Sequence, residues 1–271
     1  MKLLVLGSGG RALCQLCPAG GAGSAAPRSR QPGAVAVRDD RGHWLLLVAA
    51  PEITRHPLIE AAAREGRLAG VVLLDARLEH AASLAELSRT RPLRLYATPA
   101  VFEELTARLP LLGVPPLGGD LRWQLLPIAG DVRTAPLRLE GMESLEGIAI
   151  DDGGWAAPYS PNRRDPVVGD GIALRIADRH SGQSFVYSPG LGIDAEPWMH
   201  GADCLLVGGG ACRMTSDEAA ATERYASIGA RRTVLVHLPD CDPRLQAGSV
   251  AQRAAEHSGL EIAHDGMEIE L

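Results

Sequence analysis

The chain of 271 residues is long enough for one large domain or two small ones. Hydrophobic residues make up 46% and charged residues 22%, which is typical of a soluble globular protein with ample material for a core. The net charge of −6 argues against non-specific binding to nucleic acid or to an anionic membrane. No apolar run approaches the roughly 20 residues of a membrane helix, and the N-terminal run is too short for a secretory signal, so we expect a cytoplasmic location.

Apolar runs in the first half of the chain predict strands that come to alternate with helices. Lys2 to Leu6 reads as a buried strand that runs into glycines at positions 7, 9 and 10. Residues 18–33 are loop by composition, and Asp39 to Gly42 is the predicted turn of a hairpin. The predicted strands are 2–6, 34–37, 44–48, 71–74 and 93–97, and the predicted helices are 58–67, 81–89 and 100–109.

The second half continues with short strands and one further helix. The predicted strands lie between 123 and 138 and at 148–150, 172–177, 184–187, 204–207 and 233–236, and the predicted helix is 216–228. His264 to Gly266 reads as a hairpin turn, to which no function is assigned. Hairpins come first, alternation follows, and no repeat or linker divides the chain. We therefore expect one layered α/β domain over residues 1–271 with a pair of mixed sheets.

The first strand is followed by Gly7-x-Gly9-x-x-Ala12, which formally matches a dinucleotide-binding fingerprint. That motif requires a helix that begins at the second glycine and points its amides at a pyrophosphate. Cys17-Pro18 and a glycine-rich loop follow instead, so no helix of useful length fits. The glycines favour a turn that needs positive φ, and we expect no nucleotide binding.

Cys14 and Cys17 have the C-x2-C spacing, in which one chelate ring can hold a tetrahedral metal ion. A single pair is half of such a site, and the sequence contains no second pair. Three interpretations stay open: a structural metal, unpaired thiols buried in a loop, or redox chemistry.

Asp75, Arg77, Glu79 and His80 form a polar cluster between the strand at 71–74 and the next helix. Their spacing is similar to H-x-H-x-D-H, in which a strand-to-helix loop directs several ligands at one or two metal ions. Imidazole with carboxylate suits zinc, iron or manganese. The alternative is that Asp75 caps the helix while Glu79 and His80 lie in solvent.

His237 directly follows the buried strand 233–236 and is a second candidate ligand. A histidine at a strand end commonly faces a cleft. The alternative is a core histidine whose hydrogen bonds are satisfied within the protein.

Several short motifs occur in a fixed order along nearly the whole chain. They are Cys14-x-x-Cys17, Ala26-Pro27-Arg28, Ala50-Pro51-Glu52-Ile53, Leu74-Asp75-Ala76-Arg77-Leu78-Glu79-His80, Pro158-Tyr159-Ser160-Pro161, Asp165-Pro166, Gly169-Asp170, Tyr187-Ser188-Pro189-Gly190-Leu191-Gly192, Ala202-Asp203-Cys204-Leu205-Leu206-Val207 and Ala263-His264-Asp265-Gly266-Met267. In this order they resemble the pyrroloquinoline quinone (PQQ) biosynthesis protein B family, a branch of the metallo-β-lactamase fold.

The sequence departs from the family pattern at several positions. Glu79 stands where the family has aspartate, and Gly208 replaces the aspartate of L-L-V-D-G, a position similar to the bridging carboxylate of the wider fold. The segment 214–230 is shorter and has no counterpart of the family's G-H-L ligand segment. Only two cysteines of a cysteine-rich loop remain, and Pro239 and Asp240 replace the asparagines that follow the histidine equivalent to His237.

The resemblance implies an αββα sandwich of two mixed sheets flanked by helices, with the site at one edge where loops meet. It implies a role in making PQQ, in which iron and dioxygen oxidise the tyrosine-derived ring of the precursor. Asp75, Glu79, His80 and His237 would then hold the metal. Cys14 and Cys17 would hold a separate structural zinc, and Tyr159 and Asp170 would lie in loops near the pocket.

Two other functions stay open beside an oxygenase. A carrier that binds PQQ or its precursor and aids export would tolerate the lost ligands, and Arg163 and Arg164 would suit its carboxylates. Those arginines could equally be a solvated loop. A metallohydrolase is disfavoured because Asp75 and Arg77 replace both upstream histidines of a dizinc site. The expected partner is PQQ or its precursor, without nucleic acid or membrane insertion, and a homodimer is admitted as the assembly.

Overall fold

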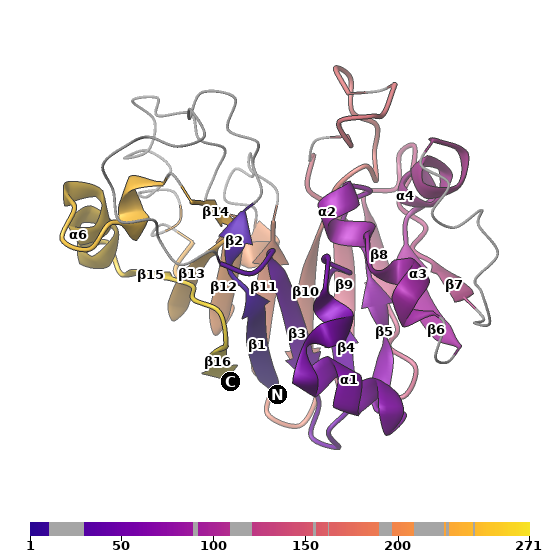
Figure 1. Cartoon of the computed structure of the whole chain (residues 1–271), viewed down its shortest axis with the longest axis horizontal. Helices are drawn as coiled ribbons and strands as arrows, with labels where there is room; N and C mark the ends of the chain where they lie inside the picture. The colour runs from indigo at the N-terminus through magenta and orange to yellow at the C-terminus, as the bar shows by residue number, and fades with distance from the viewer. Residues whose placement is uncertain are drawn as a thin grey trace.

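The computed structural model describes residues 1–10, 30–88, 92–108, 121–153, 156–161, 163–189, 197–208, 225, 228–240 and 242–271. Within these ranges the strands form two seven-stranded sheets and a separate two-stranded pair (Figure 1). The sheets lie against each other and helices lie outside them, so the expected αββα sandwich is confirmed.

The first sheet combines an antiparallel and a parallel half. In spatial order it consists of β16 (Met267–Glu270), β1 (Lys2–Gly7), β3 (Ala34–Arg38), β4 (Trp44–Leu46), β5 (Leu68–Val72), β6 (Leu93–Ala97) and β7 (Leu121–Leu125). The strands from β16 to β4 pair antiparallel, and those from β4 to β7 pair parallel. The carboxyl ends of the parallel strands therefore lie at one edge, where loops can meet.

The second sheet also combines an antiparallel and a parallel half. It consists of β15 (Leu260–Ile262), β13 (Arg232–Val236), β12 (Cys204–Gly208), β11 (Ser184–Ser188), β10 (Ile172–Asp178), β9 (Leu145–Asp151) and β8 (Thr134–Leu137). Strands β11 to β15 pair parallel, whereas β8 to β11 pair antiparallel. The parallel strands β12 and β13 are nearly continuous buried runs, as expected for strands that are covered on both faces.

The glycines after β1 do not form the predicted turn. None of Gly7, Gly9 and Gly10 has a positive φ, and Gly9–Gly10 instead forms β2, which pairs in parallel with β14 (Leu238–Pro239). A Cβ at Gly7 would lie 2.0 Å from the carbonyl oxygen of Pro32, and one at Gly10 would lie 2.1 Å from that of His237. These glycines are therefore required by close backbone approach rather than by a left-handed turn.

The helices are short. They are α1 (Pro57–Arg64), α2 (Leu78–Ala81), α3 (Leu84–Leu87), α4 (Pro99–Glu103) and α6 (Val250–His257), with a π-helical segment at Glu104–Arg108 and 3₁₀ segments at Ile53–Arg55, Pro197–Met199 and Pro243–Leu245. Among the helices of the described residues, none combines the length and the apolar character needed to span a bilayer.

Several predicted boundaries were wrong for tertiary reasons. The helix expected at 81–89 is divided into α2 and α3, because the backbone N–H and the hydroxyl of Ser83 donate to the carbonyls of Ala49 and Ala50. The strand expected at 71–74 begins earlier, at Leu68, where it joins β4. Helix α6 and strands β15 and β16 were not predicted, and the helix expected at 216–228 lies outside the described residues except for Tyr225 and Ile228.

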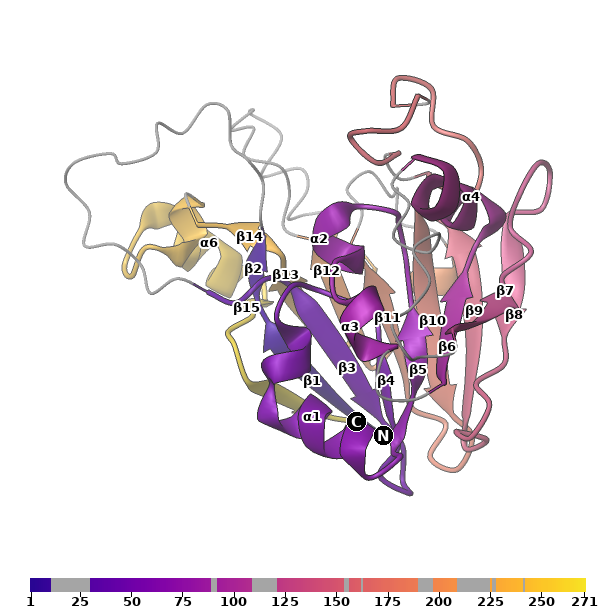
Figure 2. The same ribbon diagram turned by 45° about the vertical axis from the view of Figure 1, so that its right-hand side comes forward.

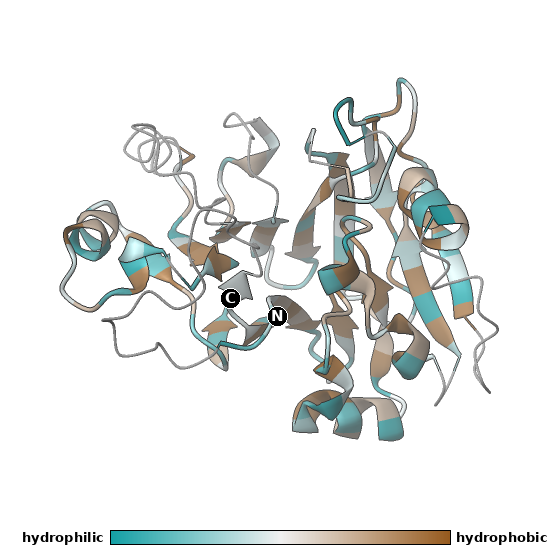
Figure 3. Ribbon diagram, turned by 45° about the horizontal axis from the view of Figure 1, so that its top comes forward, coloured by the Kyte–Doolittle hydropathy of each residue, from teal (hydrophilic) through white to brown (hydrophobic). Residues whose placement is uncertain are grey.

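The main core lies between the two sheets and continues under the helices of the first sheet. It joins residues such as Val5 and Leu95 of the first sheet to Phe185 and Leu206 of the second. In Figure 2 helices α1 and α3 stand before the first sheet, with β9, β10 and β11 behind it. Figure 3 shows that the strands in the interior of the molecule are largely apolar and that α1 and α6 carry polar residues. A second cluster, which includes Ala255 of α6, covers the outer face of β12 and β13.

Candidate functional site

The loop between β5 and α2 closes around Asp75. One of its carboxylate oxygens accepts a hydrogen bond of 2.9 Å from the backbone N–H of Arg77, which turns the chain toward α2. The two carboxylate oxygens lie 2.8 and 2.9 Å from Nδ1 of His80. The helix-cap alternative is wrong, because the N-cap residue of α2 is Arg77 and no side chain caps the helix. His80 does not lie in solvent either, since only 7% of its surface is exposed.

The charge of Asp75 is set by these contacts. Burial would raise the pKa of its carboxyl, but the charge and hydrogen bond of His80, together with Arg77, overcome burial and lower that pKa to about 2. Asp75 is therefore an ionised carboxylate that accepts from Nδ1 of His80. This arrangement leaves Nε2 of His80 as the nitrogen for a metal ion or another ligand, as in carboxylate–histidine–metal sites.

His237 follows β13 and is held by close packing. It has a φ of 56°, which is rare for a residue other than glycine and adds strain. Its Nδ1 faces Gly33, where a Cβ would lie only 1.9 Å away, and its Nε2 lies 2.5 Å from the hydroxyl of Tyr187. Nε2 is thus the ring nitrogen that contacts a polar side chain.

Burial decides the protonation of this second group. Burial, followed by the nearby charge of His80, lowers the pKa of His237 to about 3, so the ring is neutral at physiological pH. Burial also raises the pKa of the fully buried Tyr187, whose hydroxyl stays protonated and can donate to Nε2. His237 consequently has one unprotonated ring nitrogen, and its Nε2 is bonded to the hydroxyl of Tyr187 in this structure.

The imidazole rings of His80 and His237 lie close to each other, although the two residues follow strands of different sheets. The ring centroids of His80 and His237 are 5.7 Å apart at an interplanar angle of 56°. Two rings that bind one zinc ion through nitrogens at about 2.1 Å have centroids roughly 5 to 6.5 Å apart. The spacing of the two rings lies within this range.

The larger predicted ligand set is not assembled as a closed cage. In the part of the chain that the structure describes, no three of histidine, cysteine, aspartate and glutamate are placed to hold a metal ion. The structure brings Asp75, His80 and His237 together, whereas Glu79 lies partly buried on α2. Ligation of a metal by Asp75 or Glu79 stays a prediction, and Cys14 and Cys17 lie outside the described residues.

The loss of the aspartate at Gly208 has a steric counterpart. Gly208 ends β12, and a Cβ there would lie 2.3 Å from the carbonyl oxygen of Pro189. No carboxylate can enter at this position unless the backbone of Pro189 moves. Most of the shortened segment 214–230 lies outside the described residues.

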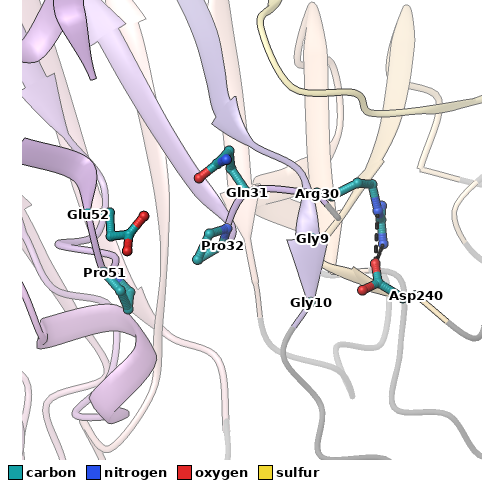
Figure 4. Close-up of a pocket in the computed structure, with 8 residues that line it drawn as sticks. All are labelled: Gly9, Gly10, Arg30, Gln31, Pro32, Pro51, Glu52 and Asp240. Carbon is teal, nitrogen blue, oxygen red and sulfur yellow. Dashed lines mark hydrogen bonds and ion pairs between the residues drawn. The ribbon is translucent and has the colours of Figure 1, made fainter. Parts of the chain in front are cut away.

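A groove runs between the segment at Gln31 and Pro32 and the segment at Pro51 and Glu52. Two adjoining cavities of about 230 and 320 Å³ share the residues Gln31, Pro32, Pro51 and Glu52. Figure 4 shows Pro51 and Glu52 on one side of the first cavity and Gln31, Gly9 and the Arg30–Asp240 ion pair on the other. The second cavity continues along the following 3₁₀ segment, past Arg55 and His56.

Both walls of the groove are tied to the histidines. The wall at Pro51 follows Ala49, whose N–H donates to the carbonyl of His80 at 2.7 Å. The opposite wall contains Gly10, which is packed against the backbone of His237. The groove is therefore connected to both histidines through their backbones, although neither imidazole lines it.

The four predicted substrate residues lie elsewhere. Tyr159 donates its hydroxyl to the carbonyl of Ala76, and burial raises its pKa. Asp170 is buried, accepts from the N–H of Val167 at 2.8 Å, and has a pKa raised by burial. Arg163 and Arg164 are exposed, and none of the four lines the groove. Their contact with substrate stays a prediction.

Sequence reasoning missed three residues that shape the site. Tyr187 could have been noticed, because a tyrosine in a buried strand needs a partner for its hydroxyl. Glu52 has a φ of 63° in the groove wall; it belongs to the motif Ala50-Pro51-Glu52-Ile53, which gave it no role in the site. Asp265, in the turn left without a function, accepts from the N–H and hydroxyl of Ser8 and from the N–H of Gln31, each at 2.8 Å. It thereby fixes the wall of the groove.

Comparisons with known proteins agree with this architecture. A β-lactamase superfamily domain matches residues 43–238. Coenzyme PQQ synthesis protein B of Cupriavidus necator is 34% identical over 95% of this chain and 93% of its own length, and that of Stutzerimonas stutzeri is 32% identical with the same coverage. The crystal structure of zinc-bound PqqB from Methylobacterium extorquens superposes with a TM-score of 0.74 at 22% identity, over the whole of both chains. The chain therefore belongs to the coenzyme PQQ synthesis protein B family, within the β-lactamase superfamily.

Proposed function

We propose that this protein acts in the biosynthesis of coenzyme PQQ in the cytoplasm, and that His80 and His237 bind a metal ion at which the tyrosine-derived part of the precursor is oxidised. The observation that carries the proposal is the meeting of two imidazoles from opposite sheets, one of them held by the buried carboxylate of Asp75. The names of the relatives and the zinc in the Methylobacterium protein support it.

When bound, iron would supply redox chemistry with dioxygen, which zinc cannot supply. Hydroxylation would insert one oxygen atom of dioxygen into a ring C–H bond. The other atom would leave as water, with two protons and two electrons from an external reductant. In that setting Asp75 fixes the orientation of His80, and burial keeps His237 neutral with a lone pair to donate.

The groove supplies the place for the precursor. Glu52 and Arg55 are exposed in its wall, where they form an ion pair of 3.6 Å, and Gln31 adds an amide across from Glu52. A molecule with both ammonium and carboxylate groups could be oriented there by charge-assisted hydrogen bonds. Tyr187 does not line the groove, but its hydroxyl could hold or release a proton at Nε2 of His237.

A carrier that binds PQQ or its precursor without catalysis is the second candidate. It is favoured by two observations: no group of three ligands exists among the described residues, and Tyr187 occupies Nε2 of His237. A carrier needs the groove and its charges but no bound metal.

Metal titration tests the first half of the proposal. The titration is made in a Cys14→Ser/Cys17→Ser background, which should contain about one zinc less per chain if those thiols hold a structural zinc. His80→Ala should then lower the affinity for zinc or ferrous iron by tens-fold, and Asp75→Asn by roughly ten- to hundredfold. His257→Ala, an exposed histidine on α6, is the matched control and should leave the affinity unchanged.

Two assays separate enzyme from carrier. Protein loaded with iron without oxygen should oxidise a tyrosine-containing precursor once air is admitted, and His80→Ala should not. A bacterium that lacks its own family member should recover PQQ formation with the wild-type chain. Recovery by both the wild type and His80→Ala, without oxidation in vitro, would reject the oxygenase and leave the carrier.

A further inference from the structure

Glu104 is a buried carboxylate that no sequence motif marked. It begins the π-helical segment after α4 and is 6% exposed. One oxygen, Oε1, accepts a hydrogen bond of 2.7 Å from the hydroxyl of Ser160. The other, Oε2, is buried without a hydrogen-bond partner in the described part of the chain. Burying an oxygen without a hydrogen-bond partner costs free energy. The stability of the fold therefore does not explain why a glutamate stands at position 104.

Its partner belongs to a turn that reaches the candidate site. Ser160 closes the turn by donating its N–H to the carbonyl of Ala157 at 2.8 Å. The preceding residue, Tyr159, donates its hydroxyl to the carbonyl of Ala76, the residue directly after Asp75. A chain of contacts therefore runs from Glu104 through the turn to the loop that aims His80.

The stretch that follows this turn is fixed at its other end, at Gly169 and Ile172, by separate contacts. The hydroxyl of Thr98, the N-cap residue of α4, donates to the carbonyl of Gly169 at 2.6 Å. The N–H of Ile172 donates to the carbonyl of Leu74 at 2.9 Å. The hydroxyl of Ser160 links the tip at Tyr159 and Ser160 to Glu104.

We propose that Glu104 is a positioning residue: through Ser160 it holds Tyr159 against Ala76, and so fixes the loop in which Asp75 orients His80. The hydrogen bond requires an acceptor oxygen at this place, which glutamine also provides. Only the metal readout of this inference rests on the proposed function, because the position of the loop can be measured without a metal.

The first measurement is hydrogen exchange of the metal-free chain, followed in peptides that cover residues 74–82. Glu104→Ala, Ser160→Ala and Tyr159→Phe should each speed exchange there by about five- to tenfold, the factor expected from loss of one buried hydrogen bond. Glu104→Gln should stay within about twofold of the wild type, because its amide oxygen can still accept from Ser160. Ser160→Ala and Tyr159→Phe keep the test decisive if Glu104→Ala does not fold.

The second measurement is zinc affinity in the Cys14→Ser/Cys17→Ser background. Glu104→Ala should bind zinc about tenfold more weakly, and Glu104→Gln should restore the affinity. Ser249→Ala is the matched control, because it removes a hydroxyl that caps α6 and bonds to Pro243, far from the loop. It should lower the melting temperature without changing zinc affinity or exchange at 74–82.

The outcomes decide between the ideas. Wild-type exchange at 74–82 in Glu104→Ala, or equal acceleration in Glu104→Ala and Glu104→Gln, would overturn the positioning role. If neither the wild type nor any variant binds zinc at this site, the proposed metal function fails. The exchange pattern would still decide whether Glu104 positions the loop.

Discussion

His80 lies on the short helix α2, which follows β5 of the first sheet, whereas His237 directly follows β13 of the second sheet. His80 is held by an ion: its Nδ1 faces the carboxylate of Asp75, which the backbone of Arg77 fixes in turn. His237 is held by close packing and by a hydrogen bond with an uncharged side chain. Its ring is placed between Gly33 and the hydroxyl of Tyr187, and its backbone is in the left-handed region.

The difference shows two physical routes to the same result, an imidazole with one available nitrogen. A carboxylate orients His80 and makes its free nitrogen more basic. Burial keeps His237 neutral, and the absence of a side chain at Gly33 leaves the space that the ring occupies. The first route is electrostatic and the second is steric, so each should respond to a different perturbation.

The largest expected effect is a loss of stability of the metal-free protein in acid that comes from His237. Its pKa is about 6.5 unfolded and about 3 folded, so the unfolded chain binds the proton first. This contribution is fully present above pH 6.5. It is lost as pH falls toward 3, by up to about 1.4 kcal/mol per pH unit and about 4 kcal/mol by pH 3.5. Urea unfolding between pH 7.5 and 4.5 measures the slope. His237→Gln should remove it and His80→Gln should keep most of it; equal slopes in both variants would contradict burial as its cause.

Next in size is the steric side of the comparison. Gly33→Ala should destabilise the protein by up to about 3 kcal/mol, because the new methyl group overlaps the His237 ring. In a His237→Ala background the same substitution should cost less than about 1 kcal/mol, since the ring is gone. Chemical denaturation of the four proteins gives the coupling. Additive losses would show that Gly33 is required for another reason, such as its backbone contact with Gly9.

The electrostatic side is smaller. The fall of the Asp75 pKa from 3.8 to about 2 corresponds to about 2 kcal/mol of stability. For a lowered carboxyl pKa, this contribution is present above pH 3.8 and is lost as pH falls through about 2. The free energy of unfolding of Asp75→Asn should therefore be about 2 kcal/mol lower than that of the wild type from pH 7 down to about 4.5. The His237 effect, in contrast, changes with pH over this range. A gap between the variant and the wild type that shrinks already between pH 7 and 5 would argue against the assignment.

The smallest effect concerns the groove. Glu52→Gly should raise stability by up to about 1 kcal/mol, because glycine tolerates a φ of 63° without strain. Glu52→Ala removes the same carboxylate but keeps the strain, and should not be stabilising. Thermal melting compares the two, and binding of the precursor should weaken in both. A stabilising Glu52→Ala would show that the carboxylate, and not the backbone, causes the strain.

Local pattern was sufficient for much of the architecture and for part of the site. Buried apolar runs predicted strands such as 34–37 and 204–207, because a strand that is covered on both faces is apolar throughout. The ordered motifs predicted the family, and the spacing from Asp75 to His80 brought a carboxylate and an imidazole together across one turn. These features depend on neighbours within a few residues, which the sequence displays directly.

Only the tertiary structure decided the rest, because the contacts join residues that are far apart in the chain. Strands β7 and β8 follow each other in sequence, yet they lie at the edges of different sheets. Tyr187 reaches His237 across 50 positions, and Glu104 reaches Ser160 across 56. Gly33 and Gly208 look like loop and strand-end glycines until His237 and Pro189 are placed against them. The sequence by itself determined which segments form strands and which loop carries Asp75 and His80. The packing of the two sheets determined what those residues meet, since close approach and burial are properties of the folded chain.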